Sequence, residues 1–243
     1  MRFEKPLLRG VLLKRRQRFL ADVRLADGTQ VTAHCPNSGS MLGCLVPGSP
    51  VRLSESRNPR RRLPYTWEMV RVGRTWVGIN TQWPNRLVEE ALGEGRIPEL
   101  AGYGVLRREV PVGEGCRMDL LLRNGRECCY VEVKNVTLAS EGVALFPDAV
   151  TQRGTRHLRV LMDMAARGHR AVMLYVVQRE DCQRFRPAQS IDPQYARTLR
   201  EAVASGVEVL VYRARVRPQG IHLERSLAWD LDCREGRARA PEG

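Results

Sequence analysis

The sequence lacks several features that would place it in a common protein class. Its seven cysteines include no Cys-x-x-Cys pair, so neither a zinc knuckle nor a disulfide framework is indicated, and we expect reduced thiols. It has no run of about 18 apolar residues that would cross a membrane, and residues 1–10 are charged and carry no apolar stretch of a signal peptide. We therefore expect a cytoplasmic protein without membrane association.

Lysine is also scarce. Of the 40 basic residues, three are lysine (Lys5, Lys14 and Lys134) and the other 37 are arginine. The net charge of +13 attracts polyanions through phosphate neutralisation and counterion release, so DNA is the expected partner, with association to the nucleoid as one location. Lys134 stands out, because an ammonium behaves differently from the planar, always charged arginine fork. Nothing indicates an obligatory protein partner or fixes the oligomeric state.

Residues 7–81 show a pattern of short strands and turns. Strands are expected over 19–25, 30–34, 51–54, 65–72 and 74–80, with a strong hairpin turn at Asp27-Gly28. So many short strands in so few residues predict a small closed barrel, and we assign residues 1–83 to it. An OB-like barrel suits a basic protein because it presents a groove to oligonucleotides, although strand spacing alone leaves an SH3-like barrel open.

A second domain is expected over residues 84–233, followed by a flexible tail over 234–243, which is polar and lacks periodicity. We predict a helix over 84–92, strands over 104–110, 117–122 and 127–136, a helix after Thr151, a buried strand over 170–178, a helix between Asp192 and Gly206, and a strand over 207–216. This order predicts a mixed sheet flanked by helices, so the whole chain belongs to the α+β class.

Three residues of the types found in metal-dependent phosphodiesterase sites lie on two of these strands. Asp119 lies on the first strand, and Glu132 and Lys134 lie on the strand that returns after a hairpin turn. Residues two apart in a strand point to the same face, and pairing through the hairpin brings Asp119 beside them. Asp119, Glu132 and the Val133 carbonyl are hard oxygen ligands of the kind that Mg²⁺ or Mn²⁺ takes. Lys134 would orient or deprotonate water, or stabilise charge on a phosphate.

Other interpretations of these carboxylates stay open. A Glu-x-Lys pair on a strand is also common as a salt bridge on a solvated sheet. Glu109, at the end of the preceding strand, would add a third carboxylate that holds a metal, or would be an exposed glutamate beside two arginines. Catalytic roles are therefore predicted for Asp119, Glu132, Lys134 and Glu109, and metal binding for the three acids.

A helix N-terminus provides candidate DNA contacts. Thr151, Arg153 and His157 begin the helix after residue 151, where free backbone amides, an arginine and a hydroxyl suit phosphate oxygens. Thr151 also fits a plain helix cap, and His157 a histidine at the edge of the core. In the barrel, Asn37 and Ser38 offer further donors.

Two arginine clusters provide further candidate DNA contacts. The first contains Arg15, Arg16 and Arg18, and the second contains Arg57, Arg60, Arg61 and Arg62. The second is favoured, because no acidic residue lies within it. Trp67, Trp76 and Trp83 either stack bases in the barrel groove or lie in the core.

Five ordered segments resemble one family. The segments RFLADV (18–23), HCPNSGSM (34–41), YTWE (65–68), EVKNVTL (132–138) and FPDAVTQRG (146–154) are similar to the sugar fermentation stimulation protein A (SfsA) family. The resemblance implies an OB-type domain followed by a domain like the PD-(D/E)xK nucleases, DNA binding, and a link to sugar metabolism, especially that of maltose. It carries the nuclease-like motif onto Glu109, Asp119, Glu132 and Lys134.

Two functional hypotheses follow. In the first, the protein binds DNA and hydrolyses phosphodiester bonds with Mg²⁺ or Mn²⁺ as cofactor. In the second, it is a DNA-binding transcriptional regulator of sugar fermentation genes that does not cleave, since nuclease-like folds can persist as binding modules. A small-molecule enzyme is a third class, which no residue pattern supports.

Overall fold

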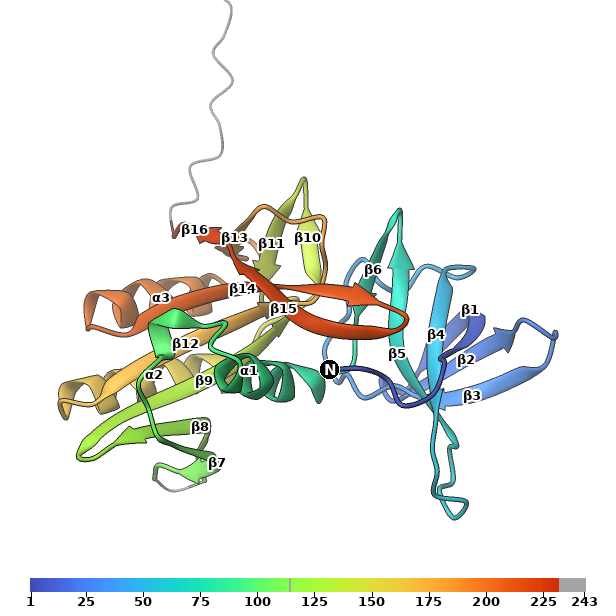
Figure 1. Cartoon of the computed structure of the whole chain (residues 1–243). Helices are drawn as coiled ribbons and strands as arrows, with labels where there is room; N and C mark the ends of the chain where they lie inside the picture. Colours follow the sequence, from blue (N-terminus) through green and yellow to red (C-terminus); the bar gives the residue numbers. More distant parts are fainter. Residues whose placement is uncertain (114, 232–243) are drawn as a thin grey trace, which may run out of the picture.

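The structure is a computed structural model that describes residues 1–113 and 115–231. A β-barrel formed by the N-terminal part of the chain lies beside a larger unit of sheets and helices (Figure 1). The tail predicted over 234–243 lies outside the described residues.

The barrel is a curved antiparallel sheet that closes on itself. Its strands are β1 (Leu8–Arg16), β2 (Leu20–Leu25), β3 (Gln30–His34), β4 (Pro50–Glu55), β5 (Tyr65–Val72) and β6 (Thr75–Gly78), in the order β3-β2-β1-β4-β5-β6. A parallel pairing of β3 with β5, at His34 and Thr66, joins the two ends. The sheet thereby forms the small closed barrel that the sequence predicts.

Alternation along the strands fills the barrel. In β2, Ala21 and Val23 are fully buried, whereas Asp22 and Arg24 point to the outside, as the two-residue period of a strand requires. Trp67 is also fully buried in this core, and its indole nitrogen donates to the carbonyl of Met69 (3.0 Å). The suggestion that Trp67 stacks on bases is therefore wrong.

The second unit contains two sheets. It begins with helix α1 (Trp83–Gly93) and the short 3-10 helix η1 (Pro98–Leu100). The main sheet has the order β15-β14-β12-β9-β8-β7 and is mixed, as predicted, because β9, β12 and β14 are parallel and the outer pairs are antiparallel. Its strands are β7 (Val105–Pro111), β8 (Arg117–Asn124), β9 (Glu127–Val136), β12 (Arg170–Val177), β14 (Glu208–Arg217) and β15 (Gly220–Ser226). The smaller sheet, in the order β10-β11-β13-β16, is formed by β10 (Leu138–Ser140), β11 (Val143–Phe146), β13 (Arg184–Pro187) and β16 (Ala228–Trp229).

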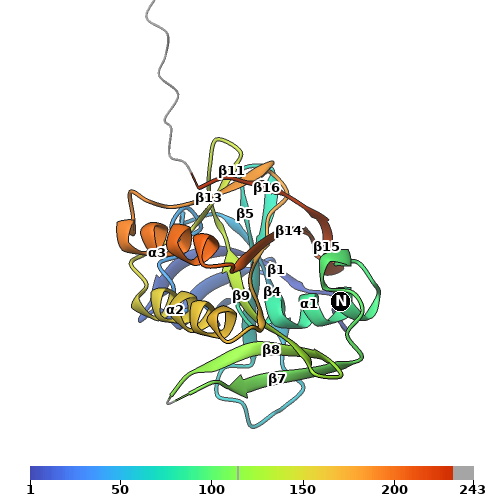
Figure 2. The ribbon, with the colours of Figure 1, turned by 90° about the vertical axis from the view of Figure 1, so that its left-hand side faces the viewer.

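Helices cover both faces of the main sheet (Figure 2). Helices α2 (Gln152–Ala166) and α3 (Pro193–Ala204) lie on one face, and α1 lies on the other. Strand β12 is consequently buried on both sides: Val172 and Leu174 pack in the α1 core, whereas Met173 and Tyr175 pack in the core of α2 and α3. Such a strand is a continuous apolar run, which explains why the sequence predicts it well.

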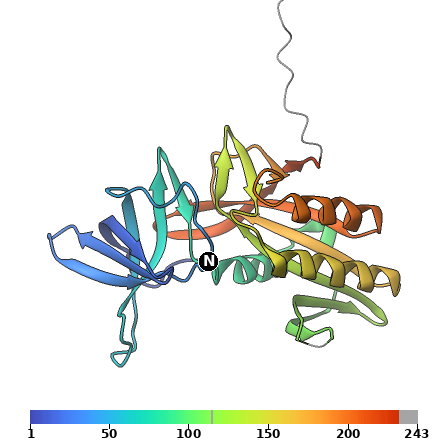
Figure 3. The same cartoon turned by 180° about the vertical axis from the view of Figure 1, so that it is seen from behind.

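The barrel is joined to the second unit by backbone and side-chain contacts of Gln178. The amide of Gly78 donates to the Gln178 carbonyl (2.9 Å), and the Gln178 side-chain amide donates to the Asn80 carbonyl (3.3 Å). A Cβ added to Gly78 would lie 2.4 Å from Gln178 Oε1, so only glycine fits this close approach. The view from behind shows the β14–β15 hairpin reaching toward the same edge of the barrel (Figure 3).

The first residues of the chain pack on the second unit. Phe3 donates its backbone amide to the carbonyl of Gln219 (3.2 Å), Arg2 forms a β-bridge with Gly220, and Leu7 lies in the α1 core. The predicted barrel domain 1–83 therefore includes a short segment that belongs to the other unit by its contacts. The first residues pack there because β15 is an edge strand, whose unpaired backbone groups are available for pairing.

Candidate functional site

The predicted carboxylates and lysine meet at a pocket where the barrel faces the second unit. We call it the carboxylate pocket; it has a volume of about 350 Å³. Its polar lining includes Asp119, Glu132 and Lys134 from the main sheet. From other elements, its polar lining includes Asn37, Ser38, Thr81, Asn85, Asp148 and Arg153. The three side chains that the sequence predicts to converge therefore line one pocket.

Strand pairing explains this convergence. Leu120 pairs with Val131 in the β8–β9 ladder, so Asp119 lies just beyond the paired residues, opposite Glu132. There its Oδ2 accepts a hydrogen bond from the Val133 amide (2.8 Å). The Asp119 side chain takes the place of a ladder partner and is fixed against the strand that carries the other two residues.

Asp119 has an environment that favours its protonated form. Burial, and after it the nearby Glu132 carboxylate, raise its pKa from 3.8 to about 6, although the Val133 amide, the Asn85 amide and Lys134 act in the opposite direction. Asn85 Nδ2, in the first turn of α1, donates to Asp119 Oδ1 (3.0 Å). A cation that binds here would displace this proton.

Glu132 is the most buried member of the site, with 2% of its surface exposed. Its Oε1 accepts from Lys134 Nζ (2.5 Å) and lies in hydrogen-bond contact with His157 Nδ1. Burial raises its pKa, but the His157 hydrogen bond and the Lys134 charge outweigh burial, so the net pKa is below its ordinary value. Glu132 Oε2 is buried and has no hydrogen-bond partner within 1–113 and 115–231.

A histidine and an arginine of α2 hold this glutamate from behind. Arg153 Nε donates to His157 Nε2 (3.3 Å), so that nitrogen is an acceptor and the ring proton is on Nδ1, which faces Glu132. Thr151 caps the helix by accepting from the Gly154 amide (3.0 Å). The predicted direct DNA contact of His157 is wrong for this geometry, because its side chain is 5% exposed and lies behind Glu132.

Glu109 does not join the trio. By strand register it lies opposite Asp119, between the pairs Arg108–Leu120 and Val110–Met118, but its φ of 50° interrupts the ladder. Its side chain lines a separate pocket of about 430 Å³ and is absent from the carboxylate pocket. The prediction that Glu109 binds the same metal is therefore not supported by this arrangement.

The remaining donors fit a divalent cation that keeps waters. Among the described residues, no group of three or more His, Cys, Asp and Glu side chains is arranged to hold a metal. Asp119 and Glu132 do face one pocket, however, and the partnerless Glu132 Oε2 is a buried acceptor that requires a donor or a cation. One or two carboxylates plus water are the donor set that Mg²⁺ typically takes.

Two residues that sequence reasoning missed support the pocket from outside the sheet. Asp148 Oδ2 accepts from the Met41 amide (2.7 Å), and Ser40 Oγ donates to the Asp148 carbonyl (2.6 Å), so the barrel loop is tied to the second unit. Asn85 holds Asp119 as described above. Asn85 follows the proline that opens α1, and an amide there offers no periodic signal that would reveal its long-range contact.

Comparison with known proteins identifies the family. The family model of the sugar fermentation stimulation protein RE domain matches residues 82–220, and that of the SfsA N-terminal OB domain matches residues 13–79. Sugar fermentation stimulation protein homologs from Geobacter sp. (strain M21) and Thioalkalivibrio sulfidiphilus (strain HL-EbGR7) are 57% and 56% identical, over 93% and 95% of this chain and 98% of each relative. The chain belongs to the sugar fermentation stimulation protein family. The resemblance seen in its sequence is thereby confirmed.

A solved structure of another SfsA protein agrees with the whole fold. SfsA of Pyrococcus furiosus, solved in complex with Ca²⁺, is 26% identical, with a TM-score of 0.87 over 95% of this chain and 98% of that chain. The predicted fold, an OB-like barrel followed by a mixed sheet with helices in the α+β class, is confirmed.

Several predicted DNA contacts of this SfsA protein have partners within the protein. Arg15 donates to the carbonyls of Asn37 (2.6 Å) and Gly39 (3.0 Å) and so pins the loop that lines the carboxylate pocket. Arg16 forms a bidentate pair with Asp22 (2.7 and 2.8 Å). These contacts give both arginines structural roles.

Other candidates remain at the surface. Arg18, Arg60 and Arg62 are exposed, and Arg61 is half-buried. Arg57 pairs with Glu4 (2.8 Å), but both side chains are more than two-thirds exposed, so the pair is weak. Of the two polar candidates in the barrel, Asn37 is buried and bonded to the Ile79 carbonyl (3.1 Å), whereas Ser38 is exposed at the pocket.

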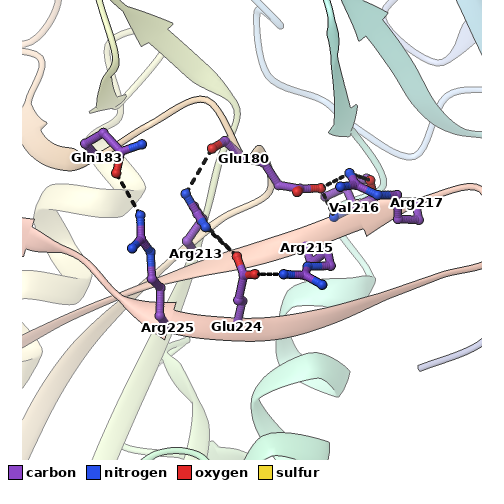
Figure 4. Close-up of polar contacts among 8 residues, drawn as sticks. All are labelled: Glu180, Gln183, Arg213, Arg215, Val216, Arg217, Glu224 and Arg225. Carbon is purple, nitrogen blue, oxygen red and sulfur yellow. Dashed lines mark hydrogen bonds and ion pairs between the residues drawn. The ribbon is translucent and has the colours of Figure 1, made fainter.

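The arginines of the β14–β15 hairpin are partly neutralised by two glutamates (Figure 4). Arg213 and Arg215 both bind Glu224, and Arg217 binds Glu180. This face therefore contributes less positive field than its arginine content suggests. Within the described residues, no helix has the length and apolar character needed to span a membrane.

Proposed function

We propose that this SfsA protein is a divalent-metal-dependent nuclease that hydrolyses phosphodiester bonds of DNA in the carboxylate pocket. The observation that carries the proposal is the buried, partnerless Glu132 Oε2 beside Asp119 and Lys134. A buried acceptor without a partner is costly, and a cation at this point satisfies it. The net charge of +13 supplies the attraction for a polyanionic substrate.

Asp119 and Glu132 are the residues that would hold Mg²⁺ or Mn²⁺. The Ca²⁺ in the Pyrococcus furiosus relative supports a divalent cation, since Ca²⁺ also prefers oxygen ligands. When bound, such an ion polarises a phosphoryl oxygen and lowers the pKa of a coordinated water.

The protein's own groups then act on the substrate. Lys134 lines the pocket beside Glu132, and 13% of its side chain is exposed. Its ammonium group stabilises the negative charge that develops on the phosphate. His157 orients Glu132 through Oε1 and leaves Oε2 available. Arg153 lines the same pocket at the first turn of α2, where an arginine and free backbone amides suit a phosphate.

The test is cleavage of duplex, single-stranded and branched DNA with Mg²⁺ or Mn²⁺. Wild type is expected to cut at least one substrate, and EDTA to stop cleavage. Asp119→Asn and Glu132→Gln are each expected to lower the rate by at least about 100-fold, because each removes a metal ligand. Glu127→Gln, an exposed acid on the same strand, is the matched control. Metal-loaded wild type that leaves every substrate intact would overturn the proposal.

A second function, DNA binding without cleavage, is favoured by one observation. Glu109 lines a different pocket, so the carboxylate pocket contains only two, Asp119 and Glu132, of the three acids that the family resemblance assigns to the motif. In that case the protein acts on sugar fermentation genes through binding alone. Wild type would then bind DNA with a steep salt dependence and show no metal-dependent cleavage.

A further inference from the structure

A second pocket lies on the other side of the segment that connects the barrel to α1. We call it the junction pocket; it has a volume of about 480 Å³ and shares no lining residue with the carboxylate pocket. The connecting segment divides its side chains between the two: Thr81 and Asn85 line the carboxylate pocket, and Gln82 and Trp83 line the junction pocket. A ligand in one pocket is therefore a close neighbour of a ligand in the other.

An aromatic wall of the junction pocket is held in place by a buried carboxylate. Glu68, 2% exposed, accepts from Trp83 Nε1 (2.6 Å), Asn80 Nδ2 (2.8 Å) and Ser54 Oγ (2.6 Å). Phe3 packs edge-on against Trp83, with ring centroids 6.1 Å apart. Glu68 and Phe3 thus fix the orientation of the Trp83 indole. A ring that is held in place before a ligand binds is preorganised for stacking.

Hydrogen-bonding groups lie beside this wall. His34, Gln82 and Thr66 line the pocket together with the aromatic residues. Burial lowers the pKa of His34, and the positive charge of Arg61 lowers it further, so the ring is neutral at pH 7. A neutral imidazole has one donor and one acceptor nitrogen, the combination that a nucleobase edge also presents.

The remaining charged lining is mixed, with more positive than negative groups. The positive side chains are Arg2, Lys5, Arg57, Arg61 and Arg86, and the acidic ones are Glu4, Glu55 and the buried Glu68. Arg86 lies over the Trp83 ring, 5.2 Å from its centroid, and is itself exposed, so this end of the aromatic wall is next to positive charge. The Arg57–Glu4 pair is exposed and weak, so Arg57 can exchange Glu4 for a phosphate at little cost.

We propose that the junction pocket binds one unpaired nucleotide of the DNA, with the base against Trp83 and Phe3 and its phosphate on Arg57 and Arg61. This proposal rests on the proposed function and deepens it, because it predicts a preference for DNA with a single-stranded segment next to the cleavage site. An aromatic ring of fixed orientation, polar groups that suit a base edge and a rim with an excess of positive charge together match a nucleotide. The volume is also within the usual range of about 300–1,000 Å³ for ligand pockets.

The test measures binding without metal, so that it does not depend on cleavage. Fluorescence anisotropy in EDTA compares a labelled single-stranded oligonucleotide with a blunt duplex of equal length. The variant Arg57→Ala/Arg61→Ala is expected to weaken single-strand binding by about tenfold, and duplex binding no more than the control does. The control Arg24→Ala/Arg74→Ala removes the same charge from exposed positions outside both pockets.

Trp83→Leu tests the aromatic wall separately. It is expected to weaken single-strand binding by about five- to a hundredfold, the range found for loss of base stacking, with an unfolding transition still present. Thymidine monophosphate is added as a competitor: failure to compete at millimolar concentration indicates that the site needs the DNA strand, and competition indicates that it accepts the same chemistry from a free nucleotide. Equal losses in the arginine variant and its control would overturn the proposal. Lack of cleavage by the wild type would bear on the proposed function alone.

Discussion

Asp119 links the chemistry of the site to pH. Its pKa of about 6 lies above the ordinary 3.8, so the folded protein holds this proton more tightly than the unfolded chain does. Without metal, the stability contributed by this group is complete below pH 4 and is lost as the pH rises through about 6. A divalent cation competes with the proton for the same carboxylate. Cation binding is therefore favoured when the pH rises and Asp119 loses its proton.

We therefore expect metal affinity to rise with pH. Mn²⁺ should bind about tenfold more weakly at pH 5 than on the plateau above pH 7, because proton and metal exclude each other at a carboxyl of pKa about 6. Calorimetric titration across this range measures the affinity. In EDTA, the melting temperature of Asp119→Asn relative to wild type should rise between pH 5 and pH 7. A pH-independent Mn²⁺ affinity would contradict the account.

A buried tyrosine pair near the site gives a second prediction at this scale. The hydroxyls of Tyr175 and Tyr195 are 2.5 Å apart, and both side chains are fully buried. Tyr195→Phe leaves the Tyr175 hydroxyl without its partner and should cost about 1–3 kcal/mol in urea unfolding. The double variant Tyr175→Phe/Tyr195→Phe should lose less than either single variant, since it leaves no orphan. A double variant that loses the sum of the two would argue against this explanation.

The site was predictable from sequence only in part. Asp119, Glu132 and Lys134 lie on two strands joined by a hairpin, so local pairing suffices to bring them together. His157 and Asn85 reach them from helices that begin far away in the sequence, and no local pattern encodes those contacts. For Glu109 the strand register is right, but a φ of 50° turns the side chain into another pocket.

At the scale of single elements, the start of helix α2 positions part of the carboxylate pocket. Thr151 Oγ1 accepts from the Gly154 amide, and the Thr151 amide in turn donates to Asp192, the cap of α3. Thr151→Ala should destabilise the protein by about 0.5–2 kcal/mol, whereas Thr151→Ser should retain most of the stability. Chemical denaturation measures both. Equal losses for alanine and serine would show that the hydroxyl cap is not what matters.

Elements were predictable where their own residues carry the pattern. Strands β3, β5 and β9 have the predicted bounds, because each alternates or is apolar throughout between clear turns. Strands β10, β11, β13 and β16 were missed, since they are short and obtain their stability from partners distant in the sequence. Strand β15 had a usable signal in the alternation of Ile221 and Leu223, which lies beyond the predicted end of the domain's last strand.

At the scale of the whole molecule, the two units are joined where Gly78 meets Gln178. Gly78→Ala should cost about 1–3 kcal/mol, because the new methyl group would overlap the Gln178 side chain. The same change should cost less in a Gln178→Ala background, which removes the overlapping amide. A double-mutant cycle by urea unfolding measures this coupling. A cost of Gly78→Ala that is equal in both backgrounds would contradict the close contact.

In the proposed function, the carboxylate pocket of this SfsA protein cleaves DNA with Lys134 as a catalytic residue. Single-turnover cleavage by Lys134→Ala with Mn²⁺, measured together with DNA binding, tests this role. We expect the rate to fall by at least about 100-fold, because a charge aimed at the phosphate is lost, while binding stays within about twofold of wild type. Lys14→Ala, which removes an exposed lysine from β1, should leave both unchanged. Cleavage by Lys134→Ala at the wild-type rate would contradict the account.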